Sequence, residues 1–575
     1  MQLTNNSEES RELFLEAFYN LKGYFLYATL FSAAINLLML TPILYMLLVY
    51  DRVVSSGSME TLTMLTVLMV MLLMFSGAFE WTRTRLLIAA NVKLEDSLRS
   101  AVSKASFRNV LLTGNPSGSS LPMGDLLALR QFVTGSGLFA LMDAPWTPIY
   151  IGIMFVFHPS FGISAIIAAI ILVILALVTQ KTTAGKLQKA RAFNQRANLS
   201  FTSKLTNSEA IHGMGMGSRI QERSNQDYKE ASYEQAVASS AGGRLSAISK
   251  TFRLISQSLL LGLGAYLVLV QAISPGMMIA GSLLLGRALA PIDLMVGNWR
   301  GFIDAGGQFS RIRQILKMQP EEREKLALPA PLGQVSLENI VVVPPGSNAA
   351  SVKGLSLSLS AGESLGIIGP SAAGKTSLAR AILGVWPLAA GAVRIDGAEI
   401  GQWDRDRLGP YLGYLPQDIE LFDGTIAENI CRFNEPNSDK IIDASRSAGI
   451  HEMILQLPDG YDSPIGAASG LLSAGQRQRV GLARAIYDNP KLILLDEPNS
   501  NLDEQGERDL LLALRRMKEL GSTILIITHR TSILSLVDKL VVMKNGLAVQ
   551  FGDRDSVLRD MRAESAKVTQ LQKKS

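Results

Sequence analysis

The sequence contains a single cysteine, Cys431, among 575 residues. One cysteine can form no intrachain disulfide, and the residues that accompany a thiol-protease nucleophile are missing, so a disulfide scaffold and a cysteine protease are both excluded. A cleavable secretion signal is also lacking, because the first apolar run is too long for one. The cysteine therefore fits a part of the chain that lies in a reducing compartment.

Charge is scarce, since only 18% of the residues are charged and the net charge is +5. The basic residues gather in two long polar stretches, residues 83–130 and 181–253. Such stretches suit cytosolic surfaces near lipid, so the positive balance requires no nucleic-acid partner.

What the chain does have is long apolar runs. A membrane span needs about 20 apolar residues, and six runs approach or exceed that length: residues 24–50, 62–79, 148–157, 161–179, 255–273 and 276–296. The third is short unless it begins near Leu138. The turns after the first, third and fifth runs carry only Arg52 as a basic residue, so the positive-inside rule places both termini and both polar stretches in the cytosol.

One charge lies inside the last predicted span. Arg287 is about halfway across if the span begins near Gly276, and a charge there costs roughly 2.5 to 3.5 kcal/mol on insertion scales. Asp293 is about 240° around the same helix, so the two side chains should not pair directly. We expect Arg287 to line a water-filled passage; a structural ion pair with another helix is the alternative.

A Gly-rich segment follows the spans, between a predicted strand (residues 363–368) and a predicted helix (residues 375–383). Its glycines let successive N–H groups converge on phosphate oxygens, and the helix N-terminus and Lys375 add positive charge. The predicted ATP-binding residues are Gly369, Pro370, Ser371, Ala372, Ala373, Gly374, Lys375, Thr376 and Ser377. The Thr376 hydroxyl is suited to Mg²⁺.

Two later strands should deliver the reactive groups. The apolar run 492–495 ends in Asp496 and Glu497, and the run 523–528 is followed by His529. Asp496 is suited to hold Mg²⁺ and Glu497 to polarise the attacking water. A lone histidine is usually structural, but the position of His529 after the other two motifs favours a catalytic role.

This order of motifs resembles the ATP-binding cassette (ABC) family. The most specific element is residues 472–476, Leu-Ser-Ala-Gly-Gln, which differs from the family signature Leu-Ser-Gly-Gly-Gln only at Ala474. The resemblance implies that Ser473, Ala474, Gly475 and Gln476 close over the nucleotide of a second subunit, and hence a homodimer. It also implies that Gln417 contacts Mg²⁺ and senses the membrane domain.

Two positions depart from the family pattern. Pro344 stands where the family has an aromatic residue that stacks on adenine, and Ala467 stands where exporters often have glutamate. Stacking of a base on an aromatic ring is worth roughly 1 to 3 kcal/mol. We therefore expect weaker binding of adenine and the loss of one contact across the subunits.

Segments around the spans are similar to the ATPases of type I protein secretion systems, namely residues 37–58, 143–148 and 286–291. The resemblance is to the subgroup that exports metalloproteases, lipases or haem-binding proteins with an uncleaved C-terminal signal. It implies a bacterial inner-membrane location, a periplasmic adaptor and an outer-membrane tunnel protein. About twenty residues precede the first span, so we expect no N-terminal peptidase-like domain.

The predicted fold is a six-span helical exporter domain, residues 1–325, followed by an α/β phosphate-loop ATPase domain, residues 326–575. The predicted activity is ATP hydrolysis coupled to protein export. Two alternatives share these features: an exporter of lipid or small molecules, and a non-translocating ATPase that acts as a regulatory scaffold. Glu497 and His529 argue against an inactive scaffold.

Overall fold

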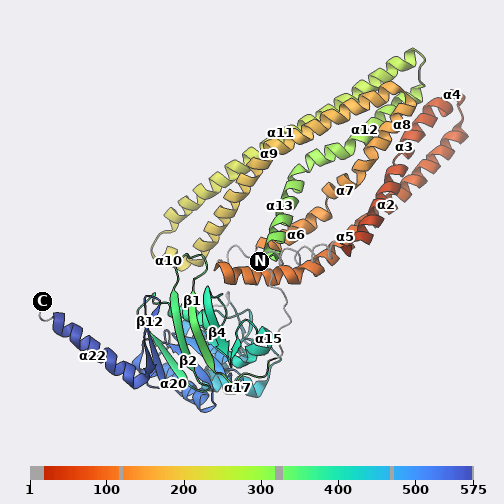
Figure 1. The fold of residues 1–575 in the computed structure, drawn as a ribbon. Helices are drawn as coiled ribbons and strands as arrows, with labels where there is room; N and C mark the ends of the chain where they lie inside the picture. Colours follow the sequence, from red (N-terminus) through yellow and green to blue (C-terminus); the bar gives the residue numbers. More distant parts are fainter. Residues whose placement is uncertain (1–18, 115–120, 318–327, 467–471, 573–575) are drawn as a thin grey trace. The chain divides into compact units, whose positions relative to one another are not determined.

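The computed structural model describes residues 19–114, 121–317, 328–466 and 472–572. The chain divides into two compact units, residues 1–110 with 115–321, and residues 111–114 with 322–575 (Figure 1). The first unit is helical and the second combines helices with sheets. The predicted fold class, six spans followed by an α/β domain, is confirmed.

The described part of the first unit consists of helices and helical turns of very different lengths. They are α2 (Lys22–Leu38), α3 (Thr41–Leu48), the π-helix η1 (Val49–Val53), α4 (Val54–Ser56), α5 (Met59–Thr113), α6 (Leu121–Val133), α7 (Ser136–Asp143), the 3₁₀ turn η3 (Ala144–Trp146), α8 (Thr147–Phe157), α9 (Pro159–Thr206), α10 (Ser208–Gly213), α11 (Gly217–Leu269), α12 (Pro275–Gly297) and α13 (Trp299–Leu316).

Six of these helical stretches are long and apolar enough to cross a membrane: Lys22–Ser56, Met59–Thr113, Gly137–Phe157, Pro159–Thr206, Gly217–Leu269 and Pro275–Gly297. The third span begins upstream of the short apolar run because α7, η3 and α8 follow one another without a break. Helices α9 and α11 lie side by side, and both continue well past the length that a bilayer requires (Figure 1).

The first span is interrupted between α2 and α3. Pro42 lacks an N–H, and the N–H of Leu40 donates to the carbonyl of Leu37 at 3.1 Å instead of to that of Asn36. The hydroxyl of Tyr150, on α8, donates to the carbonyl oxygen of Asn36 at 2.9 Å. A side chain of the third span thus satisfies a backbone oxygen that the interruption in the first span leaves free.

Two larger sheets and one small ribbon form the second unit. The strands are β1 (Val335–Val342), β2 (Val352–Leu359), β3 (Ser364–Ile368), β4 (Ala390–Ile395), β5 (Ala398–Glu399), β6 (Leu412–Leu415), β7 (Gly424–Thr425), β8 (Pro464–Ile465), β9 (Leu492–Asp496), β10 (Thr523–Ile527), β11 (Lys539–Lys544) and β12 (Leu547–Asp553). One sheet has the order β2-β1-β4-β5, and the other has the order β12-β11-β3-β10-β9-β6, parallel except for β12.

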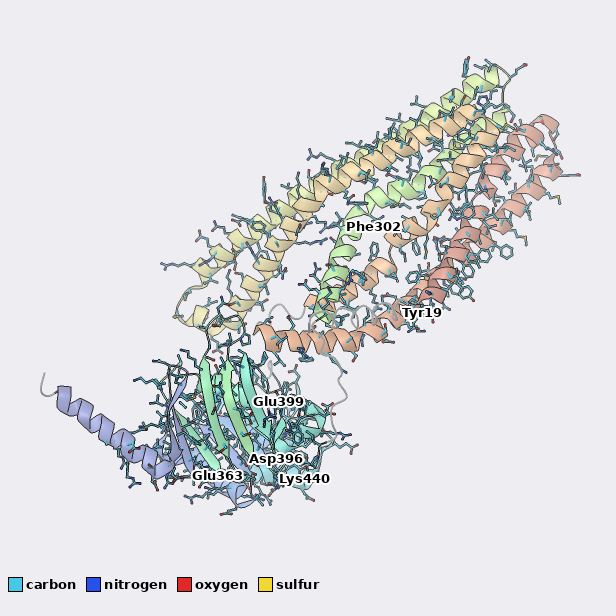
Figure 2. All side chains as sticks on the ribbon, viewed as in Figure 1. Tyr19, Phe302, Glu363, Asp396, Glu399 and Lys440 are labelled. Atoms are coloured by element: carbon cyan, nitrogen blue, oxygen red, sulfur yellow. The ribbon has the colours of Figure 1, made fainter. Side chains whose placement is uncertain are left out.

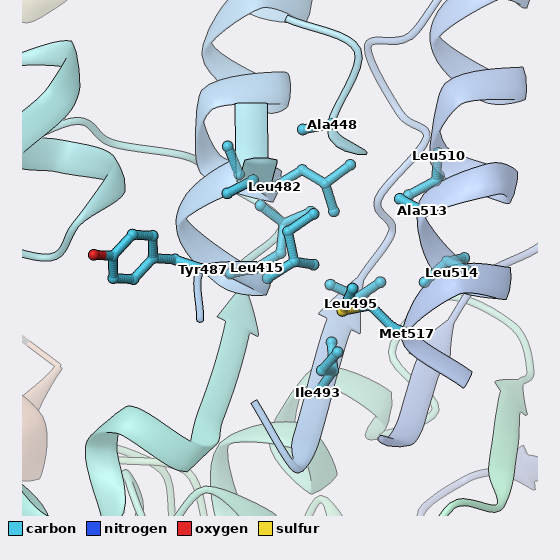
Figure 3. Close-up of a cluster of buried hydrophobic side chains, with 14 of the residues drawn as sticks. Leu415, Ala448, Leu482, Tyr487, Ile493, Leu495, Leu510, Ala513, Leu514 and Met517 are labelled. Atoms are coloured by element: carbon cyan, nitrogen blue, oxygen red, sulfur yellow. The ribbon is translucent and has the colours of Figure 1, made fainter. Parts of the chain in front are cut away.

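The second unit also contains helices. They are α14 (Lys375–Ile382), α15 (Arg405–Leu408), α16 (Ile426–Ile430), α17 (Ser438–Ser447), α18 (His451–Leu455), α19 (Ala474–Ile486), α20 (Glu504–Glu519), α21 (Thr531–Leu534) and α22 (Arg554–Gln572), with 3₁₀ turns η4 (Gly409–Tyr411) and η5 (Gly460–Asp462). Of these helices, α14, α16, α19 and α22 contact the strands. Leu415 and Leu495 from the sheet, Leu482 from α19 and Leu510 from α20 meet in a buried core (Figure 3).

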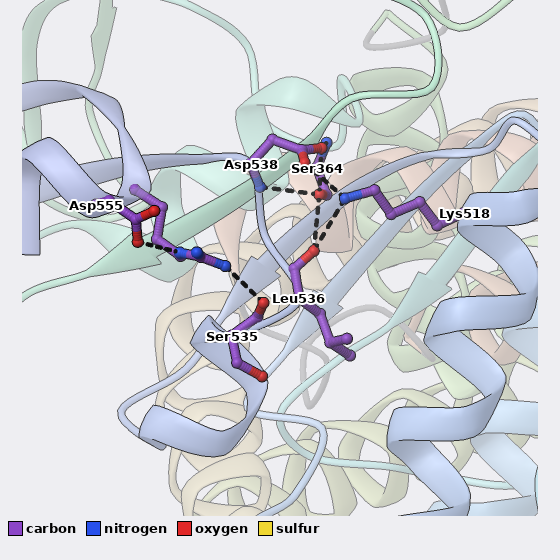
Figure 4. A network of polar contacts seen from close by, with 7 residues as sticks. Ser364, Lys518, Ser535, Leu536, Asp538 and Asp555 are labelled. Carbon is purple, nitrogen blue, oxygen red and sulfur yellow. Dashed lines mark hydrogen bonds and ion pairs between the residues drawn. The ribbon is translucent and has the colours of Figure 1, made fainter.

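A polar network fixes the opposite end of the central strands. The carboxylate of Asp538 accepts hydrogen bonds from the backbone and side chain of Ser364 and from Lys518 (Figure 4). This network anchors the start of β3 beside β11. The other end of β3, where the phosphate loop begins, is thereby held in a fixed position.

Candidate nucleotide site

The Gly-rich loop lies between the end of β3 and the start of α14, as predicted. Gly369 and Gly374 have φ angles of 153° and 97°. A Cβ atom at Gly369 would lie 2.2 Å from the carbonyl oxygen of Met543, and one at Gly374 would lie 2.2 Å from that of Ser351. Glycine is therefore required at both positions by backbone conformation and by space.

Lys375 opens α14 and is buried. Its ammonium group donates to the carbonyl oxygens of Gly369 and Pro370 at 2.8 and 3.0 Å, so it lies over the loop. Burial lowers the pKa of Lys375, and the negative charges of Glu497 and Asp496 oppose that shift. A phosphate group at the loop would meet this ammonium and the N-terminal end of α14 together.

A hairpin that the sequence analysis did not identify supports the loop. Between β11 and β12, Asn545 and Gly546 both have positive φ angles, 51° and 84°. The N–H of Gly546 donates to the carbonyl oxygen of Ala373 at 3.2 Å, and the N–H of Lys353 donates to that of Gly546 at 2.8 Å. An Asn-Gly pair between apolar runs was the available signal for a hairpin, although not for its contact with the loop.

Asp496 ends β9 and is only 1% exposed. Neither carboxylate oxygen has a hydrogen-bond partner among the described residues. Burial raises the pKa of Asp496. The neighbouring Thr376 hydroxyl acts in the opposite direction, since it stabilises the charged carboxylate. The two groups are nevertheless not joined by a hydrogen bond of normal geometry. A buried carboxylate with free oxygens beside a threonine hydroxyl fits a hard divalent cation such as Mg²⁺.

Glu497 follows with a positive φ angle of 50°, and its N–H donates to the carbonyl oxygen of Ile527 at 2.9 Å. This turn brings three predicted catalytic residues together. The side-chain nitrogen of Gln417 lies 3.4 Å from Oε2 of Glu497, and Nε2 of His529 lies 3.4 Å from Oε1. A carboxylate between an amide and an imidazole is suited to orient a water molecule and accept its proton.

Gln478 is a further residue of the site whose role was not predicted. Its side chain is buried, donates to the carbonyl oxygen of Pro498 at 2.5 Å and accepts from the N–H of Asn501 at 2.9 Å. These bonds hold the turn that follows Glu497. Its place in the helix after the signature gave no indication of this contact.

The signature residues form the N-terminus of α19. Ser473 and Gln476 exchange hydrogen bonds between side chain and backbone at 3.3 and 2.8 Å, which is a capping box. Ala474 and Gly475 complete the first turn, and a cavity of about 380 Å³ lies beside Ser473, Gly475 and Gln476. Among the described residues no hydrogen bond joins this helix start to the phosphate loop of the same chain.

Of the two positions that depart from the family pattern, the structure describes one. Pro344 lies in the connection between β1 and β2, where its carbonyl oxygen accepts from the N–H of Ser347 at 3.0 Å. Residues 343–351 include no aromatic side chain that could stack on a base. Ala467 lies outside the described residues.

Arg287 is exposed on α12, although its neighbours Leu285, Ala288 and Leu289 are buried. Within the described ranges no ion pair involves Arg287. Asp293 faces Arg253 of α11 instead, at 3.1 Å. The expectation that Arg287 and Asp293 do not pair is confirmed.

Comparisons with known proteins agree with this geometry. The family described as "ABC transporter" matches residues 352–500, and "ABC transporter transmembrane region" matches residues 25–290. The type I secretion system ATP-binding protein PrsD of Rhizobium meliloti is 42% identical, over 92% of this chain and 91% of the relative. The cyclolysin secretion/processing ATP-binding protein CyaB of Bordetella pertussis is 30% identical, over 90% of this chain and 74% of the relative.

More distant relatives also match this chain over most of its length. The alpha-hemolysin translocation ATP-binding protein HlyB of Escherichia coli is 27% identical, over 97% of this chain and 80% of the relative. A solved structure of a bacterial Atm1-family ABC exporter with ATP bound superposes with a TM-score of 0.79, covering 97% of this chain and 98% of the other at 23% identity. That structural similarity concerns the fold alone.

Proposed function

This chain belongs to the ABC transporters of type I protein secretion, and from that premise we propose that it is the ATP-driven inner-membrane exporter of a protein with an uncleaved C-terminal signal. The observation that carries the proposal is the meeting of Gln417, Glu497 and His529 in a unit linked to six apolar spans. A hydrolytic centre in such a chain implies that ATP energy is used at a membrane.

The phosphate loop binds the ATP phosphates through its backbone N–H groups and Lys375. Glu497 orients the attacking water and takes its proton, while His529 and Gln417 hold the carboxylate from either side. Thr376, Asp496 and Gln417 would hold Mg²⁺, which when bound neutralises charge on the β- and γ-phosphates. The orphaned oxygens of Asp496 are the main support for that assignment.

We place the working site between two copies of the chain. The capped start of α19 offers backbone N–H groups and a positive helix end, both of which favour a bound anion. The phosphate loop of the same chain makes no hydrogen bond with it among the described residues. A second copy would bring its own loop to Ser473 and Gly475, so ATP would join the two subunits and hydrolysis would release them.

Arg287 is proposed to line the passage for the cargo. An exposed guanidinium without an ion-pair partner among the described residues, about 18 Å along α12 from Pro275, would be costly against lipid. A water-filled space between two copies removes that cost. The cargo would then meet a positive charge in the middle of its path.

The names of two relatives support a protein as the cargo. Cyclolysin and alpha-hemolysin are proteins, and both appear in the names of relatives that cover nearly the whole chain. We propose that this chain likewise exports a protein, with a periplasmic adaptor and an outer-membrane tunnel protein, and that both termini are cytosolic. The two polar stretches rich in basic residues support that orientation.

The proposal can be tested with the full-length protein in lipid nanodiscs. ATPase activity is measured with C-terminal peptides of secreted proteins encoded beside the gene for this chain, and with scrambled peptides of the same composition. The expected result is a change in turnover with an intact peptide and none with its scrambled form. Turnover that responds to lipid composition and to no such peptide would contradict protein export.

A further inference from the structure

A cavity of about 320 Å³ lies within the helical unit. Helices α9, α11 and α12, together with the start of α13, enclose it. Gly242 and Gly297 contribute to its wall, and a Cβ atom built at either position would meet no atom within 4 Å. The space is therefore open at these positions and is not filled by a neighbouring side chain.

The depth of the cavity follows from the lengths of its helices. Thr179 lies about 30 Å along α9 from Pro159, Val296 about 31 Å along α12 from Pro275, and Ser246 about 35 Å along α11 from Leu269. The starting points are the ends at which short turns join the spans. Because the hydrocarbon core is about 30 Å thick, all three walls reach the headgroup layer on the side where α9 and α11 leave the membrane.

Two residues at the start of α13 bring N–H donors to the cavity. Trp299 lines it, and its indole N–H is buried without an acceptor among the described residues. Arg300 lies beside it with a side chain that is 57% exposed. Of the described residues that line the cavity, none is acidic. Thr179, Thr183, Ser239 and Ser246 add hydroxyl groups. Those of Thr179 and Thr183 already donate to backbone carbonyl oxygens within α9.

The position of Arg300 is fixed by its neighbours. With its carboxamide oxygen turned toward the guanidinium, Gln235 of α11 accepts from both terminal nitrogens of Arg300 at 3.0 Å. Asp304, one turn further along α13, lies 3.9 Å from Nε and also pairs with Arg191. The aromatic rings of Trp299 and Phe302 lie 6.1 Å apart (Phe302 is labelled in Figure 2). Arg300 is thus held at the edge of the cavity.

We propose that this cavity binds the phosphodiester headgroup of an anionic phospholipid. The cavity offers donors and a guanidinium at headgroup depth, and tryptophan is enriched at that depth in membrane proteins. Anionic lipids concentrate at the cytoplasmic surface and attract basic side chains there. The site would tie the ends of three spans to the composition of the surrounding lipid, whatever the cargo is.

The test uses the full-length protein in detergent, mixed with phosphatidylglycerol or with zwitterionic phosphatidylcholine, and native mass spectrometry to count retained lipids. Wild-type protein should retain phosphatidylglycerol in preference. Arg300→Gln should weaken that retention about five-fold, the loss expected of one cation at an anionic headgroup. Gly242→Leu should fill the cavity and reduce retention without removing any charge.

Matched controls separate the cavity from general effects. Gly185→Leu places the same side chain at an exposed helical glycine whose Cβ would also meet nothing within 4 Å, and Arg313→Gln removes one charge from the same helix as Arg300. Both should retain lipid as the wild type does. Equal losses in the controls, or equal retention of the two lipids, would overturn the proposal.

A second measurement identifies the occupant. Ser246→Cys in a Cys431→Ser background places one thiol in the cavity wall. Phosphatidylglycerol should protect this thiol from a maleimide, whereas glycerol phosphate, which lacks the acyl chains, should protect it less. Protection by a peptide with a free C-terminal carboxylate and not by phosphatidylglycerol would assign the cavity to the cargo and would refute a lipid site.

Discussion

Oε1 of Glu497 and Nε2 of His529 lie 3.4 Å apart, although the two residues follow different strands of the central sheet. Glu497 follows β9 and His529 follows β10, which pair in parallel with Asp496 opposite Ile527. Parallel pairing in this register brings both side chains to the same edge. The distance allows the imidazole to orient the carboxylate that would accept the proton from water.

Glu497→Gln should abolish steady ATP hydrolysis and preserve nucleotide binding. The amide keeps the size of the side chain but cannot accept the proton, and a positioned base contributes about 100-fold or more to such a reaction. Phosphate release and binding of a fluorescent ATP analogue are the two measurements. Normal turnover would show that Glu497 is not the base.

Gln478→Ala should reduce turnover by removing support from Glu497. The substitution leaves the carbonyl oxygen of Pro498 and the N–H of Asn501 without their buried partner. Misplacement of a catalytic group by about 1 Å costs about 100-fold in rate, so we expect kcat to fall with little change in KM. Gln505→Ala, which removes an exposed glutamine whose side chain donates to Asp509, is the control.

Asp496→Asn should stabilise the Mg²⁺-free protein while abolishing Mg²⁺-dependent hydrolysis. Burial raises the pKa of Asp496, so the folded state binds a proton there more readily than the unfolded state does. The contribution of Asp496 to the free energy of unfolding is therefore present at low pH and is lost as the pH rises through the raised pKa.

If the variant gains roughly 1 kcal/mol in free energy of unfolding, its melting temperature should rise by about 2–4 °C. This rise should be larger at pH 8 than at pH 5, because only the charged carboxylate is penalised by burial. Melting curves in EDTA at the two pH values measure the difference. A lower melting temperature for the variant at pH 8 would show that the charge of Asp496 is already compensated.

The sequence predicts those parts of the site that lie in short segments. Residues 369–376 carry their own glycines and lysine, and the strand before Asp496 is an uninterrupted apolar run, so local pattern suffices for both. Gln478 and Gly546 could not be assigned in this way, because their partners lie elsewhere in the chain. The start of the third span cannot be read from the apolar run alone, because Pro145 and Pro148 interrupt the pattern while the backbone continues through η3 into α8.

Tyr150→Phe should lower the thermal stability of the protein by removing the hydrogen bond at the interruption in the first span. The hydroxyl of Tyr150 donates to the backbone oxygen of Asn36 and lies 3.0 Å from its side-chain oxygen, and both residues are buried. An unsatisfied buried carbonyl costs about 1–3 kcal/mol. Thermal unfolding in detergent should show the loss. Tyr45→Phe, which removes a partly buried hydrogen bond to Thr66, should lower the melting temperature less. An equal loss in the two variants would mean that the burial of Asn36 does not matter.

Arg287→Ala should impair export more than it impairs basal ATP hydrolysis. The guanidinium is exposed and unpaired among the described residues, so its removal breaks no ion pair that holds the helices together. Secretion of a cargo protein and ATPase activity of the purified transporter are measured in parallel. Arg253→Ala is the matched control, because it removes an arginine that pairs with Asp293 and should lower stability as well as export. If Arg287→Ala lowers both activities and the melting temperature equally, Arg287 is a structural residue and the passage lies elsewhere.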